Sequence, residues 1–328
     1  MRGVKIMPTL SEIYTPIAQP IGGVRAQVTG VWREALTLVR VSADGQPQVG
    51  GKLLRPALCL AAAGVIGARD LEYYVPMATA FEMLHIASLA HDDVIDRAVL
   101  RRGNSSLNML WDNHAAVLGG DYLVARAVET LAQYDCCPVI ANAIVSVRRM
   151  AEGELMFFGR EHAPFQREEC IALAEQKTAS LFAEACSGPT YIVDPTHRDT
   201  LYRFGIQLGI AFQIIDDLLD VTQAADTLGK PSCGDVVEGK RTLPIMYARA
   251  QLEPEEDARF AAYRDTELSD NDRAWIMETV TRTGAAERTC AEARAYAQQA
   301  REALLTLPAN PYRDTMEGIL DFILVRVS

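Results

Sequence analysis

The sequence has no Cys-x-x-Cys pair, no long apolar run and no excess of positive charge, and each lack excludes a class of protein. Seven cysteines without that spacing argue against a disulfide framework and a zinc knuckle, and they fit a reducing cytoplasm. The longest apolar stretch, residues 56–67, is far shorter than the roughly 20 residues of a membrane-spanning helix. Because 43 acidic residues outnumber 32 basic ones, nucleic-acid binding has no electrostatic support. We therefore expect a cytoplasmic protein with no membrane span and no nucleic-acid partner.

Helical periodicity runs through almost the whole chain. Of the 328 residues, 49% are hydrophobic and 23% charged, an ordinary globular composition that excludes disorder and collagen. Apolar residues recur at spacings of three and four, as around Phe81 and Phe204, without sustained alternation of period two. Turn signals such as Asp194-Pro195-Thr196, where Asp194 is expected to cap a helix, are too short to be interdomain linkers. The sequence predicts an all-α fold, one domain spanning residues 1–328 with about twelve or more helices.

Two acidic motifs stand inside apolar helical stretches. Residues 91–96 read His-Asp-Asp-Val-Ile-Asp, and residues 215–220 read Ile-Asp-Asp-Leu-Leu-Asp, 124 residues later. This separation is too long for a solenoid repeat and indicates two facing helices. In each motif the first and last carboxylates lie one turn apart on one helical face, where like charges repel. A helix cap or a solvated acidic face is the plain alternative. The paired motifs favour a cation instead, and all-carboxylate ligation is typical of Mg²⁺.

Basic residues follow or precede these motifs closely. Arg101 and Arg102 follow the first motif, and Lys230 and Lys240 follow the second. Upstream, residues 50–56 read Gly-Gly-Lys-Leu-Leu-Arg-Pro, with glycines that permit close backbone approach. Lys and Arg are the usual partners of phosphate, although each one alone is more often a surface charge. Together with two Asp-rich motifs they predict a diphosphate site with several metal ions.

The ordered set of motifs resembles the trans-isoprenyl diphosphate synthases, the polyprenyl synthase family, and most of all their long-chain bacterial type. The match covers roughly residues 45–250. It rests on Lys52 and Arg55 in their Gly-rich segment, His85 seven residues before Asp92, the two Asp motifs, Lys177-Thr178, Phe212-Gln213, Gly229-Lys230-Pro231 and Lys240. One departure is Leu53, where the family often has a basic residue.

The resemblance implies the fold, the ligands and the roles of individual residues. The fold would be an all-helical isoprenoid synthase bundle of type I around a deep central cavity. Three Mg²⁺ ions would hold the allylic diphosphate, with direct ligands Asp92, Asp96 and Asp216 supported by Asp93, Asp217 and Asp220. The allylic diphosphate would contact Arg101, Lys177, Lys230 and Lys240, and isopentenyl diphosphate would contact Lys52, Arg55, His85 and Arg102. Lys177, Thr178 and Gln213 would lie at the reacting carbons.

The chemistry expected from these residues is prenyl transfer. Ionisation of the allylic carbon–oxygen bond places charge on the diphosphate, which metals, Lys and Arg stabilise. Isopentenyl diphosphate then attacks the cation, and a proton is lost to the departed diphosphate, so no protein base is required. The product would be an all-trans polyprenyl diphosphate of the long-chain class, about C30–C50. Water must be excluded, because it would quench the cation.

Four alternatives compete with this interpretation. A short-chain geranylgeranyl or farnesyl diphosphate synthase would use the same site. A His-Asp metal-dependent phosphohydrolase would use His91 and Asp92, but this alternative leaves the second motif unexplained. His91 also lies on a different face of the helix from Asp92, so we expect it to be structural. A terpene cyclase usually has a mixed second motif, and a silent partner subunit typically loses the Asp-rich motifs.

Further expectations concern product length, assembly and the end of the chain. The helix before Asp92 carries four residues that we expect to limit product length: Ala80, Leu84, Ala87 and Ser88. Along the helix axis the first three lie about 18, 12 and 7–8 Å from Asp92. Small residues there leave room for a long product, or they merely permit close helix packing. The long apolar helix expected over residues 115–132 favours a homodimer. An apolar polyprenyl product favours peripheral contact of the protein with a membrane when the product is released. From Gln251 on, no motif suggests chemistry, and we expect packing only.

Overall fold

The structure, a computed structural model, describes residues 8–39, 51–96, 100–101, 104–105, 109, 112–156, 166–224 and 231–326. Within these ranges the chain is helical almost throughout, which confirms the predicted all-α class. The elements in chain order are α1 (Leu10–Ile13), η1 (Thr15–Ile17), α2 (Ala18–Val39), α3 (Leu54–Val65), η3 (Glu72–Tyr74), α4 (Val75–Ile95), β1 (Leu100–Arg101), β2 (Asn104–Ser105), α6 (Asn113–Ala132), α7 (Cys137–Leu155), α8 (Arg167–Ala174), η4 (Glu175–Ala179), α9 (Ser180–Ser187), η5 (Gly188–Tyr191), η6 (Pro195–His197), α10 (Arg198–Asp220), α12 (Gly234–Val237), α13 (Leu243–Arg249), α14 (Pro254–Ala261), α15 (Asp270–Arg282), α16 (Ala285–Leu305) and α17 (Pro311–Val325). Strands β1 and β2 form one antiparallel pair.

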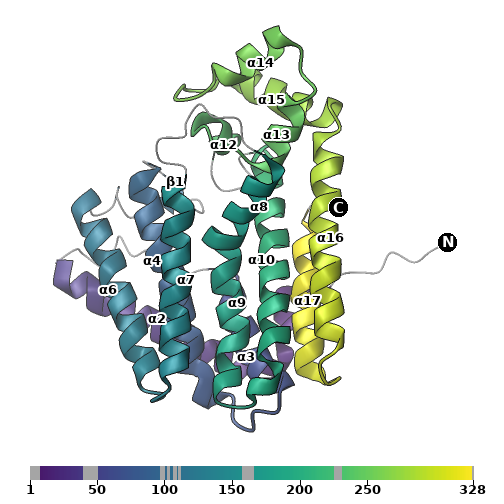
Figure 1. Ribbon diagram of the computed structural model, residues 1–328. Helices are drawn as coiled ribbons and strands as arrows, with labels where there is room; N and C mark the ends of the chain where they lie inside the picture. The colour runs from purple at the N-terminus through teal and green to yellow at the C-terminus, as the bar shows by residue number, and fades with distance from the viewer. Residues whose placement is uncertain are drawn as a thin grey trace.

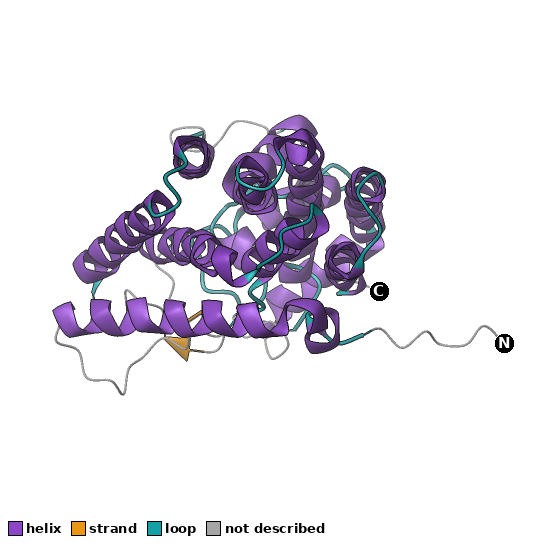
Figure 2. Cartoon of the chain, turned by 90° about the horizontal axis from the view of Figure 1, so that it is seen from below, coloured by secondary structure: helices purple, strands orange, loops and turns teal. Residues whose placement is uncertain are grey.

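The long helices run side by side and form the body of the molecule. Figure 1 shows α6 and α7 on one side, α9 and α10 in the middle, and α16 and α17 on the other side, with the short helices α12 to α15 gathered at one end. Seen from below, several of these helices appear end on, and α2 lies across the view after the N-terminal segment (Figure 2). No helix in the described ranges has both the length and the apolarity needed to cross a membrane.

Helix α10 is central because it packs against α16 on one side and against α9 and η4 on the other. The approach to η4 is so close that a Cβ at Gly209 would lie 2.4 Å from the Cα of Ala179. Glycine is therefore required at this crossing. The entry to α10 is formed as expected: Asp194 Oδ1 accepts a hydrogen bond of 2.9 Å from the backbone N–H of Thr196, in the turn that begins at Pro195.

Both acidic motifs lie at the C-terminal ends of their helices. Helix α4 ends at Ile95 with Asp96 as its C-cap, and α10 ends at Asp220. The helix dipole disfavours negative charge at this end, and these carboxylates do not cap the N-termini of the helices that carry them. Asp93 and Asp220 are each 1% exposed, so a solvated acidic face is also excluded for them. The solvated-face alternative therefore does not hold for Asp93 and Asp220, whereas the side chain of Asp216 is 46% exposed.

One buried carboxyl group outside the two motifs provides a stability test. Glu184 in α9 is 5% exposed, and its burial raises its pKa to about 7 against the opposing effects of Arg198, Ser187 and Arg149. The folded-state pKa exceeds the unfolded value of 4.5, so the protonated group stabilises the fold at low pH. This contribution is lost as pH rises toward and past about 7.

We therefore expect Glu184→Gln to become more stable relative to the wild type as pH rises from 5 to 8. Urea unfolding of both proteins at the two pH values measures the difference, with chelator present so that metals do not contribute. A difference in unfolding free energy that stays constant between the two pH values would show that Glu184 does not titrate in this range.

Candidate active site

Two lysines neutralise the first acidic motif from other parts of the chain. Lys177 Nζ lies 3.5 Å from Asp92 Oδ1 and also forms an ion pair with Glu154 of α7. Lys240 Nζ lies 3.0 Å from Asp96 Oδ2 and pairs with Glu238. Each lysine thus joins an aspartate of the first motif to a glutamate that the motif analysis left unassigned. Both lysines are among the basic residues that the sequence analysis singled out, and the expected metal ions stay a prediction.

Lys177 is positioned by an irregular helix. Residues Glu175–Ala179 form η4, a π-helical turn between α8 and α9, with Lys177 and Thr178 at its centre. Such bulges occur frequently at functional sites because they change the direction of side chains within a continuous helix. Burial works against the charge of Lys177, but the carboxylates of Asp92 and Glu154 outweigh it and raise the pKa of the ammonium group. The lysine therefore remains charged.

A short hydrogen-bond chain connects η4 to the second motif. The Thr178 hydroxyl donates to Gln213 Oε1 at 2.6 Å, and Gln213 Nε2 donates to Asp217 Oδ1 at 2.7 Å. Because Thr178 and Asp217 fix both ends of the Gln213 amide, its dipole has one orientation. The three residues that the sequence analysis placed at the reacting carbons, Lys177, Thr178 and Gln213, therefore lie together between the two Asp motifs.

Burial makes the carboxylates costly in the absence of a metal ion. It raises the pKa of Asp92, although the ammonium group of Lys177 opposes this shift. It also raises the pKa of Asp217 to about 7, with Asp216 and Asp220 adding to the shift. Divalent cations would relieve this charge. Hard oxygen donors from two helices, with lysines nearby, fit Mg²⁺, which commonly binds through a few carboxylates and keeps positions for water and phosphate oxygens.

Within the described ranges, no group of three or more His, Cys, Asp or Glu side chains is placed so that it could hold a metal ion.

Two of the predicted isopentenyl diphosphate residues, Lys52 and Arg55, lie at the start of α3. Arg55 is 7% exposed, and its guanidinium stacks 4.2 Å from the ring centre of Phe182. Lys52 is exposed, with its ammonium 5.1 Å from the centre of the Phe322 ring and its carbonyl accepting a hydrogen bond from Tyr14. These contacts hold two cations beside aromatic faces of α9 and α17.

The C-terminal helix reaches the site, and the expectation that everything after Gln251 serves packing is wrong. Arg326 Nη2 lies 3.4 Å from Asp216 Oδ1, and its guanidinium is 5.9 Å from the ring centre of Phe212. Phe212 in turn is 5.4 Å from Phe182, the ring that Arg55 covers. Two tilted aromatic rings, Phe182 and Phe212, therefore connect Arg55 to the second acidic motif.

The two histidines near the first motif behave differently. His85 is half-buried in α4, and its carbonyl accepts a hydrogen bond of 2.8 Å from Ser88. His91 faces α6: its Nε2 is 3.2 Å from the Val117 carbonyl and 3.4 Å from Asp121 Oδ1. A Cβ at Gly120 would lie 2.3 Å from the His91 ring, so α6 needs glycine there. His91 is therefore structural, as expected, and is directed away from the motif that a His-Asp hydrolase would use.

The proposed chain-length residues lie on two faces of α4. Ala80, Leu84 and Ala87 are almost fully buried and share a face with His91, which contacts α6. Ser88 lies about 40° around the helix from Asp92, whereas Ala87 lies about 140° from it. Close packing against α6 thus explains the small residues at least in part, and Ser88 is nearest to the acidic face. Their effect on product length stays a prediction.

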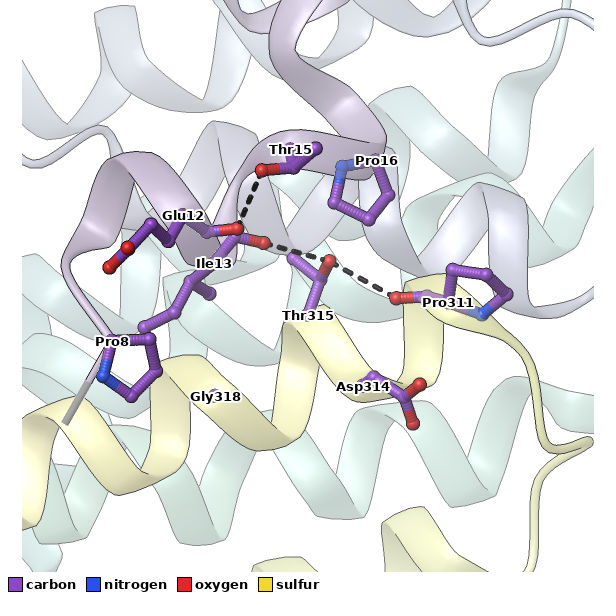
Figure 3. Close-up of a pocket in the computed structure, with 9 residues that line it drawn as sticks. All are labelled: Pro8, Glu12, Ile13, Thr15, Pro16, Pro311, Asp314, Thr315 and Gly318. Carbon is purple, nitrogen blue, oxygen red and sulfur yellow. Dashed lines mark hydrogen bonds between the residues drawn. The ribbon is translucent and has the colours of Figure 1, made fainter. Parts of the chain in front are cut away.

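Some predicted residues fall outside what the structure describes. Arg102 and Lys230 lie outside the described residues, and Arg101 is described only by its backbone, which pairs with Asn104 between β1 and β2. A pocket of about 310 Å³ between the N-terminal segment and α17 is lined by residues such as Ile13 and Thr315, none of them in an acidic motif (Figure 3). This pocket belongs to the packing of the two chain ends.

Glu154, Glu238 and Arg326 are site residues that sequence reasoning missed. Glu238 directly precedes the singled-out Gly-Lys240 pair and could have been included with it. Glu154 and Arg326 are far from every motif, and only packing of α7 and α17 against the centre brings them to it.

Comparisons with known proteins agree with this geometry. A family model described as polyprenyl synthetase matches residues 38–280. The chain is 33% identical to an all-trans-nonaprenyl-diphosphate synthase from Rhodobacter capsulatus, over 96% of this chain and 98% of that protein. It is 31% identical to the octaprenyl diphosphate synthase of Escherichia coli, over 94% and 97%. The crystal structure of a polyprenyl synthase from Caulobacter crescentus, complexed with calcium and isoprenyl diphosphate, superposes with a TM-score of 0.87 at 31% identity, covering 99% of this chain and 100% of that one.

These findings confirm the predicted fold and the transferase class. The chain therefore belongs to the polyprenyl synthetase family.

Proposed function

We propose that the protein elongates an allylic diphosphate with isopentenyl diphosphate to an all-trans product of about C30–C50, in a Mg²⁺-dependent reaction. The observation that carries this proposal is the pairing of Asp92 with Lys177 and of Asp96 with Lys240 beside the second acidic motif. Carboxylates that can bind metal ions and ammonium groups that can bind phosphate oxygens therefore lie within salt-bridge distance of each other. The length range is also supported by the names of the similar proteins.

Asp92, Asp96 and Asp216 would hold the ions, and bound Mg²⁺ would stabilise negative charge on the leaving diphosphate. Lys177 and Lys240 would exchange part of their carboxylate contacts for phosphate oxygens, while Glu154 and Glu238 keep them in place. The Gln213 amide oxygen and the Thr178 hydroxyl would direct their dipoles at the allylic cation. Lys52 and Arg55 would bind the second diphosphate at the start of α3.

We further propose one domain spanning residues 1–328, supported by a hydrophobic cluster that runs from Ile13 to Ile323. A reducing cytoplasm as the location is supported by the seven cysteines, all with free thiols. Three Mg²⁺ ions per site remain a proposal that follows from the resemblance, and peripheral membrane contact during product release remains one that follows from the apolar product.

The function is tested by mixing the wild-type protein with radiolabelled isopentenyl diphosphate, Mg²⁺ and dimethylallyl, geranyl or farnesyl diphosphate in turn. Chromatography of the products should show one dominant all-trans polyprenyl diphosphate of about C30–C50. Release of inorganic phosphate without elongation would indicate a hydrolase, and a cyclic hydrocarbon a terpene cyclase. Products that stop at C20 or shorter would restore the short-chain alternative, and no product would indicate a silent subunit.

A homodimer through α6 and α7 is the proposed assembly. Large apolar side chains are exposed on these two helices: Val117, Leu118, Ile144 and Leu155. The two helices lie next to each other on one side of the molecule (Figure 1). A two-fold interface buries the same patch from both copies, so a single apolar face can serve both partners.

Leu118→Asp should raise the dimer dissociation constant at least tenfold, because a desolvated charge would enter the interface twice. Sedimentation velocity over a dilution series measures the effect. Leu305→Asp changes another exposed leucine, on α16 at the opposite side, and should leave the dimer intact. A wild-type protein that is monomeric at micromolar concentration would contradict the proposal.

A further inference from the structure

The last carboxylate of the second motif faces the protein backbone. Asp220 is 1% exposed, and its Oδ2 accepts a hydrogen bond of 3.0 Å from the backbone N–H of Asp235. The backbone carbonyl of Asp220 accepts a second one, of 2.8 Å, from Cys233. Two bonds from one residue therefore hold the segment that leads into α12.

That segment is strained and depends on such support. Cys233 is fully buried and has φ of 60°, in the left-handed region that a non-glycine residue seldom adopts. Helix α12 is only four residues long, so it cannot define its own position by propensity. The bonds from Asp220 therefore help to fix where α12 begins, together with the Arg273 guanidinium, which donates to the Ser232 carbonyl.

The same segment positions Lys240. The backbone N–H of Lys240 donates to the Asp235 carbonyl at 2.8 Å, after a turn at Gly239 with φ of 68°. The Lys240 ammonium then reaches Asp96 of the first motif at 3.0 Å. An unbroken series of contacts thus runs from Asp220 through Asp235 and Lys240 to Asp96, which joins the second motif to the first.

We propose that Asp220 is a positioning residue for Lys240, and that it acts on the allylic diphosphate through this lysine and not by supporting a metal ion. The proposal rests on the proposed function in one respect, the contact of Lys240 with the allylic diphosphate. Its structural part, the control of residues 233–240 by Asp220, is independent of any activity.

The structural part is tested by hydrogen–deuterium exchange on the metal-free protein. Asp220→Ala should raise the exchange rate of the Asp235 and Lys240 amides at least tenfold. The Asp235 N–H loses the Asp220 carboxylate as its acceptor, and the Lys240 N–H loses the fixed position of the Asp235 carbonyl to which it donates. Asp220→Asn keeps a side-chain oxygen as acceptor and should stay near the wild type. Asp199→Ala, which removes an exposed carboxylate at the other end of α10, is the matched control. Unchanged exchange in Asp220→Ala would overturn the proposal.

The kinetic part uses a double-mutant cycle with Lys240→Ala. Asp220→Ala should lower kcat/KM for the allylic diphosphate by about tenfold or more in the wild-type background, and by less than about twofold when Lys240 is already alanine. Asp220→Asn should recover most of the loss, and the Mg²⁺ concentration for half-maximal rate should not change. Equal losses in both backgrounds, or a Mg²⁺ requirement raised tenfold, would overturn the proposal and assign Asp220 to the metal ions. A wild-type protein without prenyl transfer would refute the proposed function, while the exchange result would still decide the role of Asp220 in the metal-free protein.

Discussion

Asp92→Ala and Asp216→Ala are each expected to lower turnover by about a thousandfold or more while the metal-free protein stays folded. The loss in rate is large because these carboxylates would hold the ions that stabilise the leaving diphosphate, and such electrostatic contributions are usually the largest ones in catalysis. The fold tolerates the change because burial raises the pKa of Asp92 and the negative end of the α4 dipole disfavours its charge. Lys177 also keeps its second partner, Glu154.

Turnover is measured by incorporation of labelled isopentenyl diphosphate, and stability by thermal unfolding in the presence of a chelator. Asp199→Ala removes an exposed aspartate from α10 and should change neither quantity. A variant at position 92 or 216 with near-normal turnover would remove that residue from the mechanism. A melting temperature lowered by many degrees would show instead that the carboxylate is needed for folding.

Product length should shorten when α4 is given a bulky aromatic just below the first motif. Ser88→Phe is expected to have the larger effect, because Ser88 lies one turn from Asp92 on nearly the same face and is only half-buried. Ala87→Phe should also shorten the product by two or more isoprene units, roughly the depth that a phenyl ring closes at this level. Ala87 is 1% exposed, so its variant has to displace neighbours and is expected to lose about 1–3 kcal/mol of stability.

Met83→Phe is the matched control on the same helix. Met83 lines a pocket of about 340 Å³ between α2, α4 and α6, together with Gln27 and Arg126, and should leave product length unchanged. Chromatography of labelled products from the three variants and the wild type gives the answer. If both Ser88→Phe and Ala87→Phe make the wild-type product, α4 does not limit chain growth, and the small residues serve packing against α6.

Local patterns predicted the fold and much of the site. Helical periodicity gave the all-α class, and Asp194 with Pro195 marked the entry to α10, because capping and φ restriction act within a few residues. The Asp motifs were found because their carboxylates occur at a fixed spacing along one helix, whereas Lys177, Thr178 and Gln213 were assigned through the resemblance to the family. His91 could be assigned to packing from its position off the Asp92 face.

Contacts between distant segments could not be predicted in the same way. Glu154 and Arg326 meet Lys177 and Asp216 only through the packing of α7 and α17, and a lone charge on a helix has no local signature of its partner. The direction of Ala87 toward α6 likewise depends on which helix covers which face of α4. Asp220 looked equivalent to Asp96 by spacing, yet its carboxylate accepts a backbone N–H that lies 15 residues further along the chain.

The claim that both acidic motifs and their lysines form one diphosphate site is tested most directly by binding and not by turnover. Inorganic diphosphate is titrated calorimetrically into the wild-type protein with and without Mg²⁺, and into Asp92→Ala, Asp216→Ala and Lys177→Ala. We expect binding that requires Mg²⁺ and weakens at least tenfold in each of the three variants, because each residue contributes to the same bound group. Diphosphate that binds the wild type equally well without Mg²⁺, or binds the Asp216 variant as tightly as the wild type, would contradict a single site shared by the two motifs.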